Sequence, residues 1–296
     1  MTFPPAASRR ESRRRTPERR GAAGRASEAE VKIVVILKQV PDTETKIKVK
    51  ADGSGIETDG IKYVISPYDE YAIEEGLRMK EKLADDSTVT VVSVGPDRAI
   101  EAIRTALAMG ADDAIHVNDP GLEGGDSLAT ARVMAKVIRD HGFDIIFAGK
   151  QAIDLDQAQV GSAVAELLDI PQVNVVAKFE LAADKTKATV SRRIEGGEEV
   201  IEVSLPALLT CEKGLNEPRY ASLPGIMKAK KKPVKQVDLA ALGLGAAEVG
   251  AAGSHVKILK WLPLPERQAG KVLKGMETAA AVKELVRLLR EEAKII

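Results

Sequence analysis

The 296-residue sequence is poor in the residues that build disulfides, metal sites and hydrolase active sites. It has one cysteine, Cys211, and three histidines, with no CxxC or HxxxH pattern. A single cysteine excludes an internal disulfide and favours a reducing compartment, so we expect a cytoplasmic protein. A metal centre or a Ser/His/Asp hydrolase has little to build on.

Net charge and long apolar runs are also lacking. The 44 basic and 44 acidic residues balance, so bulk electrostatics predict no nucleic-acid partner. No apolar run approaches membrane-spanning length, and we therefore expect no membrane insertion.

The first thirty residues differ in composition from the rest of the chain. They carry eight arginines and four glutamates with almost no apolar periodicity, which predicts a disordered Arg-rich extension. No hydrophobic stretch follows the arginines, as a secretory signal would require, and transit peptides are poor in acids. Because a valine codon can start translation in bacteria, we hypothesise that the native protein begins at Val31. An intact mass that includes residues 1–30 would contradict this.

Apolar runs alternate with helical patterns from residue 31 to about residue 170. Strands are predicted at Lys32–Val40, Ser87–Gly95, Ala114–Val117 and Phe143–Ala148. Helices are predicted after the N-cap Ser66 with Pro67 at the first position, at Ile100–Gly110, and at Leu128–Gly142, with Leu128, Ala131, Ala135 and Ile138 facing inward. This alternation predicts right-handed βαβ units and a Rossmann-like parallel sheet. In such sheets ligands bind beyond the carboxyl ends of the strands, so an adenine nucleotide is expected across the loops there.

The loop Gly149–Gly161, GKQAIDLDQAQVG, stands between a predicted strand and a predicted helix. Asp156 and Gln159 have the spacing of a capping box, which predicts a helix start near Asp156. A helix start offers free N–H groups that suit a phosphate. An ordinary α/β loop explains the pattern equally well, because there is no Walker or GxGxxG pattern to name a ligand.

The pattern changes after Pro171. Three strand-like runs, joined by Ala183-Asp184 and Gly196-Gly197, predict antiparallel strands added to the sheet. We place a nucleotide-binding domain at 31–240, and a linker with a C-terminal arm at 241–296. The linker is the small-residue stretch Gly243–Gly253, and the arm ends in a predicted helix, Thr278–Ala293. One side of that helix carries Val282, Leu285, Val286 and Leu289, which need a surface to cover them, and we expect a partner subunit to provide it.

The run Cys211–Lys232, CEKGLNEPRYASLPGIMKAKKK, carries a family resemblance. It is similar to a motif of the β subunit of electron transfer flavoproteins, the FixA-like family. KQVPD, KYVISPYDE, TALAMGAD and GKQAID also match, so the resemblance covers about Val31 to Ala293. It implies an adenine-nucleotide-binding α/β fold and a heterodimer with an α subunit that holds the redox-active FAD. That heterodimer accepts electrons from dehydrogenases, often acyl-CoA dehydrogenases, and passes them to a quinone oxidoreductase or another acceptor. The β subunit is not expected to catalyse bond chemistry alone.

The resemblance also implies site residues. The nucleotide contacts carry over to Ile36, Ser66, Pro67, Tyr68, Asp69, Val94, Gly149, Lys150, Gln151, Ala152, Ile153, Asp154, Asp156, Gln157, Ala158, Gln159 and Val160. The segment Leu215–Lys232 resembles the partner-recognition loop, with Leu215 as an exposed anchor and with Arg219 and Tyr220 beside it. A buried Leu215 with a solvated lysine run is the alternative that the residues alone favour.

The nucleotide of this subunit is AMP in one branch of the family and a second FAD in another. DLDQAQVG, Asp154–Gly161, departs from the DDDCNQTG that is usual where AMP binds, and its AQVG is closer to the electron-bifurcating type. Asp126, Ser127 and Thr130 lie in a run similar to a loop beside that second flavin. IMKAKKK and PERQAGK resemble the ordinary type. We expect FAD, which would take a hydride from NADH.

Two other classes remain open on the sequence. One is a stand-alone nucleotide-binding stress or signalling protein, which would lack the 211–232 motif and the C-terminal arm. The other is a free-standing oxidoreductase, which needs a complete flavin or nicotinamide site with an acid or base beside it. No such constellation is found, and aromatic residues make up only 3% of the chain.

Overall fold

The structure is a computed structural model that describes residues 30–265 and 269–296. The Arg-rich stretch 1–29 and residues 266–268 of the PERQAGK run lie outside the described residues. The chain forms two units. The first comprises Asp59–Lys257 with the described residues up to Thr45, and the second comprises Lys46–Thr58 with Ile258–Ile296.

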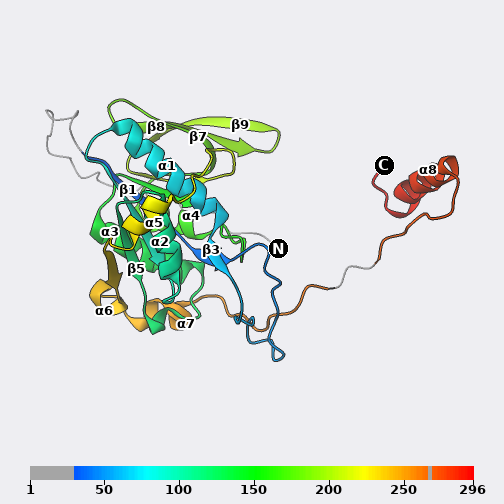
Figure 1. Cartoon of the computed structure of the whole chain (residues 1–296), viewed down its shortest axis with the longest axis horizontal. Coiled ribbons are helices and arrows are strands. Elements are labelled where there is room, and N and C mark those ends of the chain that lie inside the picture. Colours follow the sequence, from blue (N-terminus) through cyan, green and yellow to red (C-terminus); the bar gives the residue numbers. More distant parts are fainter. Residues whose placement is uncertain (1–29, 266–268) are drawn as a thin grey trace, which may run out of the picture. The chain divides into compact units, whose positions relative to one another are not determined.

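A nine-stranded sheet forms the centre of the first unit (Figure 1). Its strand order is β11-β5-β4-β1-β6-β10-β7-β8-β9. The strands are β1 (Lys32–Ile36), β4 (Thr88–Val94), β5 (Asp113–Val117), β6 (Ile145–Gly149), β7 (Gln172–Leu181), β8 (Lys187–Ile194), β9 (Gly197–Ser204), β10 (Ala207–Cys211) and β11 (Val234–Val237). Pairing is parallel from β11 to β7 and antiparallel through β8 and β9. A separate antiparallel pair joins β2 (Gln39–Pro41) to β3 (Tyr63–Ile65).

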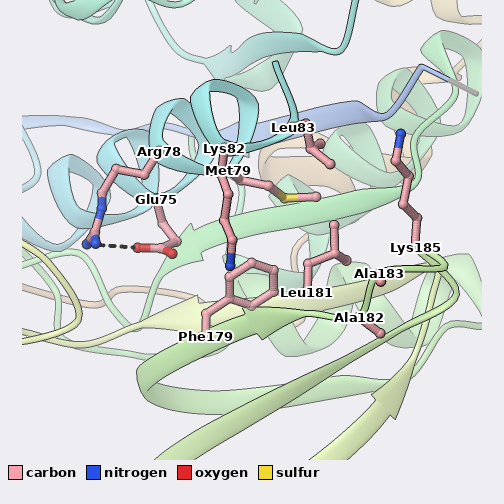
Figure 2. A pocket seen from close by; sticks show the side chains of 10 residues that line it. All are labelled: Glu75, Arg78, Met79, Lys82, Leu83, Phe179, Leu181, Ala182, Ala183 and Lys185. Atoms are coloured by element: carbon pink, nitrogen blue, oxygen red, sulfur yellow. Dashed lines mark ion pairs between the residues drawn. The ribbon is translucent and has the colours of Figure 1, made fainter. Parts of the chain in front are cut away.

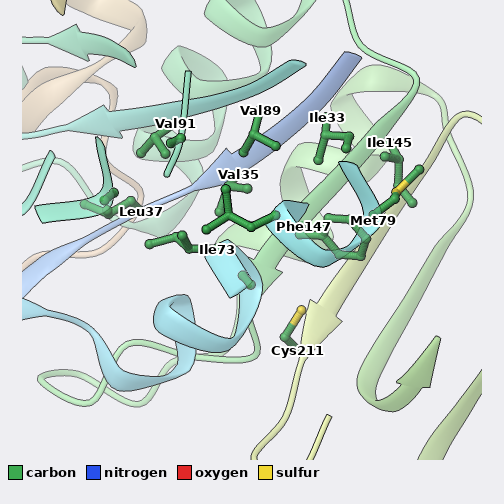
Figure 3. Close-up of a cluster of buried hydrophobic side chains, with 14 of the residues drawn as sticks. Ile33, Val35, Leu37, Ile73, Met79, Val89, Val91, Ile145, Phe147 and Cys211 are labelled. Atoms are coloured by element: carbon green, nitrogen blue, oxygen red, sulfur yellow. The ribbon is translucent and has the colours of Figure 1, made fainter. Parts of the chain in front are cut away.

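Helices cover both faces of this sheet (Figure 1). One layer holds α1 (Pro67–Leu83), α2 (Ala99–Met109) and α5 (Leu223–Ala229), and the other holds α3 (Ser127–His141), α4 (Val160–Leu168) and α6 (Leu239–Leu242). Successive residues of a strand point to opposite faces, so β1 sends Ile33 and Val35 to the first layer and Val34 and Ile36 to the second. Figure 3 shows the first cluster, where Ile33 and Val35 lie beside Phe147. Apolar runs buried on both faces are typical of parallel sheets, and the predicted α/β fold is confirmed.

The third strand-like run divides where the sequence places Pro206. β9 ends at Ser204, and β10 begins at Ala207 between β6 and β7 in the parallel sheet. Proline has no N–H to donate, so it interrupts the ladder at this point. The prediction that this run lies wholly among the added antiparallel strands is therefore wrong for β10.

The predicted start of α1 and the predicted ends of α2 and α3 are confirmed. Ser66 is the N-cap of α1 with Pro67 at its first position, and Gly110 and Gly142 close α2 and α3. Leu128 is 36% exposed, so the prediction that it faces inward is wrong. It lies in the first turn of α3, before the helix meets the sheet.

The small-residue stretch 243–253 forms two short helices that are part of the first unit. These are the 3₁₀ turn η2 (Ala246–Glu248) and α7 (Gly250–Gly253), which follow the earlier 3₁₀ turn η1 (Pro120–Leu122). A Cβ on Gly250 would lie 1.9 Å from the carbonyl oxygen of Gly121, so only glycine allows this approach. Arg132 Nη1 donates to the carbonyls of Glu248 and Gly253, at 3.2 and 3.3 Å.

The second unit contains a hairpin and the C-terminal helix. Val49 pairs with Ile56, and the amide of Trp261 donates to the carbonyl of Gly53 at 2.9 Å. The helix α8 (Thr278–Arg287) continues as a π-helical turn, η3 (Leu288–Glu292). None of the residues in either helix is buried within the described chain, and Val282 and Leu285 are 55% and 47% exposed.

Candidate nucleotide site and docking segment

The candidate site lies at the carboxyl ends of β1, β6 and β10, which are neighbours in the sheet. Asp69, in the first turn of α1, joins two of these ends. Its Oδ2 accepts a hydrogen bond from the amide of Lys38 at 2.8 Å, and its Oδ1 accepts one from the amide of Gly149 at 3.0 Å. The carboxylate thus satisfies two amides beyond the last residue of β1 and at the end of β6.

Asp69 is also the group whose protonation the fold alters most visibly at this site. Burial raises its pKa to about 7, and the two amide hydrogen bonds offset only part of this effect. Lys38 contributes a weaker opposing attraction, because its Nζ pairs with Asp154 at 2.7 Å.

Gly149, the last residue of β6, and Lys150, which follows it, are both in close contact with neighbouring elements. A Cβ on Gly149 would lie 2.3 Å from Asp69 Oδ1 and 2.8 Å from the carbonyl carbon of Tyr68, so the close approach of α1 to the strand requires glycine. Lys150 Nζ pairs with Glu212 at 2.6 Å and lies 4.8 Å from the centre of the Tyr68 ring. The Glu212 hydrogen bond raises the pKa of Lys150. Neither Lys38 nor Lys150 is thus an unmatched positive charge.

The loop from Lys150 to Gln159 corrects one prediction. Asp156 does not cap a helix, because α4 begins at Val160 with Gln159 as its N-cap residue and no side-chain cap. Asp156 and Ala158 both adopt left-handed backbone conformations, with φ of 50° and 51°. Asp156 Oδ1 instead accepts from Gln151 Nε2 at 2.8 Å, which closes the loop on itself. A capping-box spacing cannot reveal that its first member, Asp156, and a residue inside it, Ala158, are left-handed.

The structure brings the start of α3, where further flavin contacts are predicted, close to this loop. Ser127 Oγ donates to Gln157 Oε1. Asp126 caps α3 by accepting from the amide of Ala129 at 2.8 Å, and its other oxygen accepts from the amides of His255 and Val256. Thr130 Oγ1 donates to the Asp126 carbonyl at 3.0 Å. Asp126 is therefore already engaged on both carboxylate oxygens.

Within the described chain, two buried hydroxyls lie without a partner near the carboxyl ends of β1 and of the neighbouring strand β4. Among the described residues, Ser66 Oγ and Ser93 Oγ are buried without a hydrogen-bond partner. The Ser66 amide donates to the carbonyl of Lys38 at 2.9 Å, which places Ser66 at the end of β1, and Ser93 lies near the end of β4. Buried hydroxyls are normally satisfied, so these oxygens fit a polar ligand such as a nucleotide. The backbone amides at the start of α4 are a further set of donors for a phosphate.

Three other residues that are predicted to contact the nucleotide have side chains packed in the core, which leaves their backbone groups as the parts that a ligand could reach. Ile36 is 8% exposed, and Val94 and Val160 are partly buried, all three against the α3–α4 core. Sequence reasoning missed Lys38 and Glu212, which fix the site through Asp154 and Lys150. Lys38 stands two residues after the end of β1 and Glu212 directly after the end of β10, and that position is the signal that could have found them.

The docking segment, residues 211–232, begins with residues held on α1. Leu215 is half-buried and packs on the core beneath that helix. Asn216 is buried, and its Nδ2 donates to the Tyr71 carbonyl at 3.0 Å and to Glu75 Oε2 at 2.8 Å. The prediction that Leu215 is fully exposed is therefore wrong, because its side chain is partly buried against the core. Its role in partner binding stays a prediction.

Arg219 is likewise held within the chain. Its guanidinium makes ion pairs with Glu74 at 2.8 Å and Glu81 at 2.5 Å, and its amide also donates to Glu74 at 3.1 Å. Arg219 therefore fixes the segment on α1, and its charge is balanced by two carboxylates.

The exposed apolar side chains of the segment lie further along, at its α5 end. Tyr220 is 97% exposed, Leu223 74%, Met227 57% and Ile226 41%. Lys228, Lys230 and Lys231 are exposed beside them. The helix is fixed from below, because Arg104 Nη1 donates to the carbonyls of Ala229 and Lys232, both at 2.6 Å. We call Tyr220, Leu223, Ile226 and Met227 the α5 patch. An apolar patch on a fixed helix with lysines around it is typical of a protein-binding surface.

Two further features, a membrane-spanning helix and a metal-binding cluster, are absent from the described part of the chain. Across residues 30–265 and 269–296, no helix combines the length and apolar character needed to cross a bilayer. The same residues contain no group of three or more His, Cys, Asp or Glu side chains placed to hold a metal ion.

Comparison with known proteins agrees with this architecture. An electron transfer flavoprotein domain matches residues 54–242. The electron transfer flavoprotein subunit beta of Bacillus subtilis is 44% identical over 265 residues, which is 89% of this chain and 99% of the relative. The mouse protein of the same name is 43% identical over 88% of this chain and 100% of the relative, and the human one is 41% identical with the same coverage. These matches decide against a stand-alone stress protein, and the chain belongs to the electron transfer flavoprotein family, among its beta subunits.

Proposed function

We propose that this chain pairs with an alpha subunit to form an electron carrier that accepts electrons from a dehydrogenase and delivers them to a second acceptor. The observation that carries the proposal is the α5 patch, which is exposed, apolar, ringed by lysines and rigidly attached to α1 and α2. Such a surface suits a partner with an apolar pocket and an acidic rim. Acyl-CoA dehydrogenases are the donor class that the family resemblance favours.

The strand-end site is proposed to hold an adenine nucleotide. Ser66 and Ser93 supply unpaired hydroxyls, and the start of α4 supplies amides for phosphate. Both nearby lysines are matched by carboxylates. Recognition would thus rest on backbone amides and hydroxyls, with Asp69 keeping the ends of β1 and β6 together.

We further propose that the nucleotide is FAD. Ala158 and Val160 offer no side-chain hydrogen bond to hold a terminal monophosphate, and Ser127 reaches the loop at Gln157. A diphosphate running from α4 towards α3 would meet the amides of both helix starts. A flavin bound here would supply hydride-accepting chemistry, which would allow electrons from NADH to be divided between two acceptors.

The C-terminal arm is proposed to bind the alpha subunit. The apolar side of α8 has no buried residue within the described chain. An amphipathic helix of this kind gains stability when a partner covers its apolar face. Arg132 and Asp126 hold residues 248–256, so the arm leaves the first unit from a defined point.

The test is to purify the chain with its alpha subunit, release the ligands in acid and count FAD and AMP per heterodimer. Two FAD and no AMP are expected. One FAD and one AMP would overturn the FAD proposal and keep the adenine-nucleotide site. No nucleotide beyond one FAD would overturn the nucleotide site itself. Failure of the heterodimer to oxidise any reduced dehydrogenase would overturn the carrier function.

A further inference from the structure

A cavity of about 330 Å³ lies between the C-terminal half of α1 and strand β7 with the turn that follows it (Figure 2). Its apolar lining comes from Met79 and Leu83 on α1 and from Phe179 and Leu181 on β7. The volume is at the small end of the range for small-molecule pockets, so it suits a short chain better than a nucleotide. All lining residues belong to the first unit, away from the carboxyl-end loops of the nucleotide site.

Three cationic side chains line the cavity, and one of them forms no ion pair within the described chain. Arg78 pairs with Glu75 at 3.8 Å, and Lys185 pairs with Asp85 at 2.7 Å. Within the described chain, Lys82 forms no ion pair, although its charge attracts Glu75 from further away. Figure 2 shows its side chain extending from α1 towards Phe179. A single positive charge above an apolar lining is complementary to a molecule with one negative charge and an apolar tail.

We propose that this cavity binds a small amphipathic carboxylate. Its head group pairs with Lys82 and lies close to Arg78, and its chain packs on Met79, Leu83, Phe179 and Leu181. Lys82 and Arg78 are one helical turn apart on α1, so both can reach one carboxylate. Burial of the chain supplies most of the affinity, and the charge supplies the orientation.

The cavity shares one residue with the docking segment. Glu75 lines the cavity and also accepts from Asn216 Nδ2 at 2.8 Å. It is buried, and burial raises its pKa. A carboxylate that draws Arg78 towards itself removes positive charge that lowers the pKa of Glu75, so Glu75 takes up a proton more readily. The protonated acid is a weaker acceptor, and this loosens the hydrogen bond from Asn216. Binding would thereby change the mobility of the segment before α5, a consequence that rests on the proposed docking function.

The test is a calorimetric titration of the purified heterodimer with sodium octanoate. We expect saturable binding, an affinity at least tenfold lower for Lys82→Glu, and weaker binding of butyrate and 1-octanol. Lys235→Glu is the matched control, because Lys235 is an exposed lysine on β11, at the other end of the sheet, and its substitution should leave the affinity unchanged. The absence of saturable binding, or equal affinities in both variants and the unaltered protein, would overturn the proposal.

The coupling has its own measurement. Amide hydrogen exchange across residues 212–222 should become faster when octanoate binds, and unchanged exchange with octanoate bound would overturn the coupling. Neither measurement uses a dehydrogenase. A negative result would therefore overturn the cavity proposal without bearing on the proposed carrier function.

Discussion

The guanidinium of Arg219 spans both carboxylate oxygens of Glu74, with Nε at 2.8 Å from Oε2 and Nη2 at 2.9 Å from Oε1. Such two-point pairs fix orientation as well as distance. Glu74 is only 4% exposed, so its carboxylate has little contact with water and is hydrogen-bonded by Arg219 instead. The pair binds the loop before α5 to the middle of α1, and the α5 patch is therefore formed before any partner arrives.

Glu74→Gln should lower the free energy of unfolding by about 1.5–3 kcal/mol, because a hydrogen bond to a charged group is lost and Arg219 keeps only Glu81. Urea unfolding measures this. Glu81→Gln is the matched control. The Glu81 side chain is 60% exposed, so its loss should cost under about 1 kcal/mol. Equal losses of unfolding free energy in the two variants would show that the Glu74 pair stabilises the fold no more than the exposed Glu81 pair.

Leu223→Ala should slow electron transfer from the dehydrogenase without lowering the melting temperature. Leu223 is 74% exposed, so its truncation leaves no cavity, and losing an interface anchor lowers the affinity by about tenfold. Stopped-flow reduction of the heterodimer measures this effect.

Leu215→Ala should lower stability and leave electron transfer unchanged, because Leu215 packs on the core. Its loss should reduce the free energy of unfolding by about 1–2 kcal/mol, less than for a fully buried leucine. If Leu215→Ala slows transfer at full stability while Leu223→Ala has no effect, the assignment of the anchor is reversed.

The contrast between these two leucines shows where sequence reasoning stops. Both stand in one motif that indicates a docking segment, and the motif locates that segment. Which leucine faces solvent depends on Asn216 and Arg219 reaching Glu75 and Glu74, residues about 140 positions away along the chain. No local periodicity contains that contact.

The strands and long helices were predictable because their signals lie within short stretches of sequence. The signals for β1, α1 and β4 are local in the sequence. They are apolar runs for the two strands and Ser66-Pro67 for the start of the helix. The place of β10 between β6 and β7 was not predictable, because strand order is set by packing. The left-handed conformations at Asp156 and Ala158 were missed because neither residue is a glycine.

Truncation after Lys257 should weaken binding of the alpha subunit by roughly tenfold or more, because the apolar side of α8 is then lost. The cut keeps Val256, whose amide donates to Asp126 at 3.2 Å, so the nucleotide-binding unit retains its own contacts. Analytical ultracentrifugation of the two subunits gives the affinity. Equal affinity of the cut and full chains would mean that the arm is not an interface.

The free energy of unfolding should fall as the pH rises, because Asp69 loses its proton. Its pKa rises from 3.8 in the unfolded chain to about 7 in the fold, so the folded state holds the proton more tightly. The stabilisation is complete below the unfolded pKa and is lost as pH rises through the folded one. Asp69→Asn should remove this slope between about pH 4 and about pH 7, as seen in urea midpoints across that range.

Asp144→Asn is the matched control for Asp69→Asn. Asp144 Oδ2 accepts from the amide of Lys32 at 2.8 Å, and the residue is exposed. This variant also loses an amide acceptor, and it should keep the slope of the unaltered protein. A slope that persists in Asp69→Asn would assign it to other groups.

The double variant Ala158→Asn, Val160→Thr should shift the nucleotide site from FAD towards AMP. Ala158 has φ of 51°, a left-handed conformation that asparagine accepts more readily than alanine, so the change should not strain the loop. Val160 is the first residue of α4 and packs partly on the core, and threonine keeps its shape while adding a hydroxyl near the helix amides.

The two new polar groups would give a terminal monophosphate hydrogen bonds that it lacks in the unaltered loop. Acid release followed by chromatography should then show AMP rising and the second FAD falling. Ser162→Thr serves as the control: its hydroxyl accepts from Asn174 at 3.2 Å, so it adds bulk to the same helix start without a new donor. A double variant that retains two FAD per heterodimer would show that side chains 158 and 160 do not select the nucleotide.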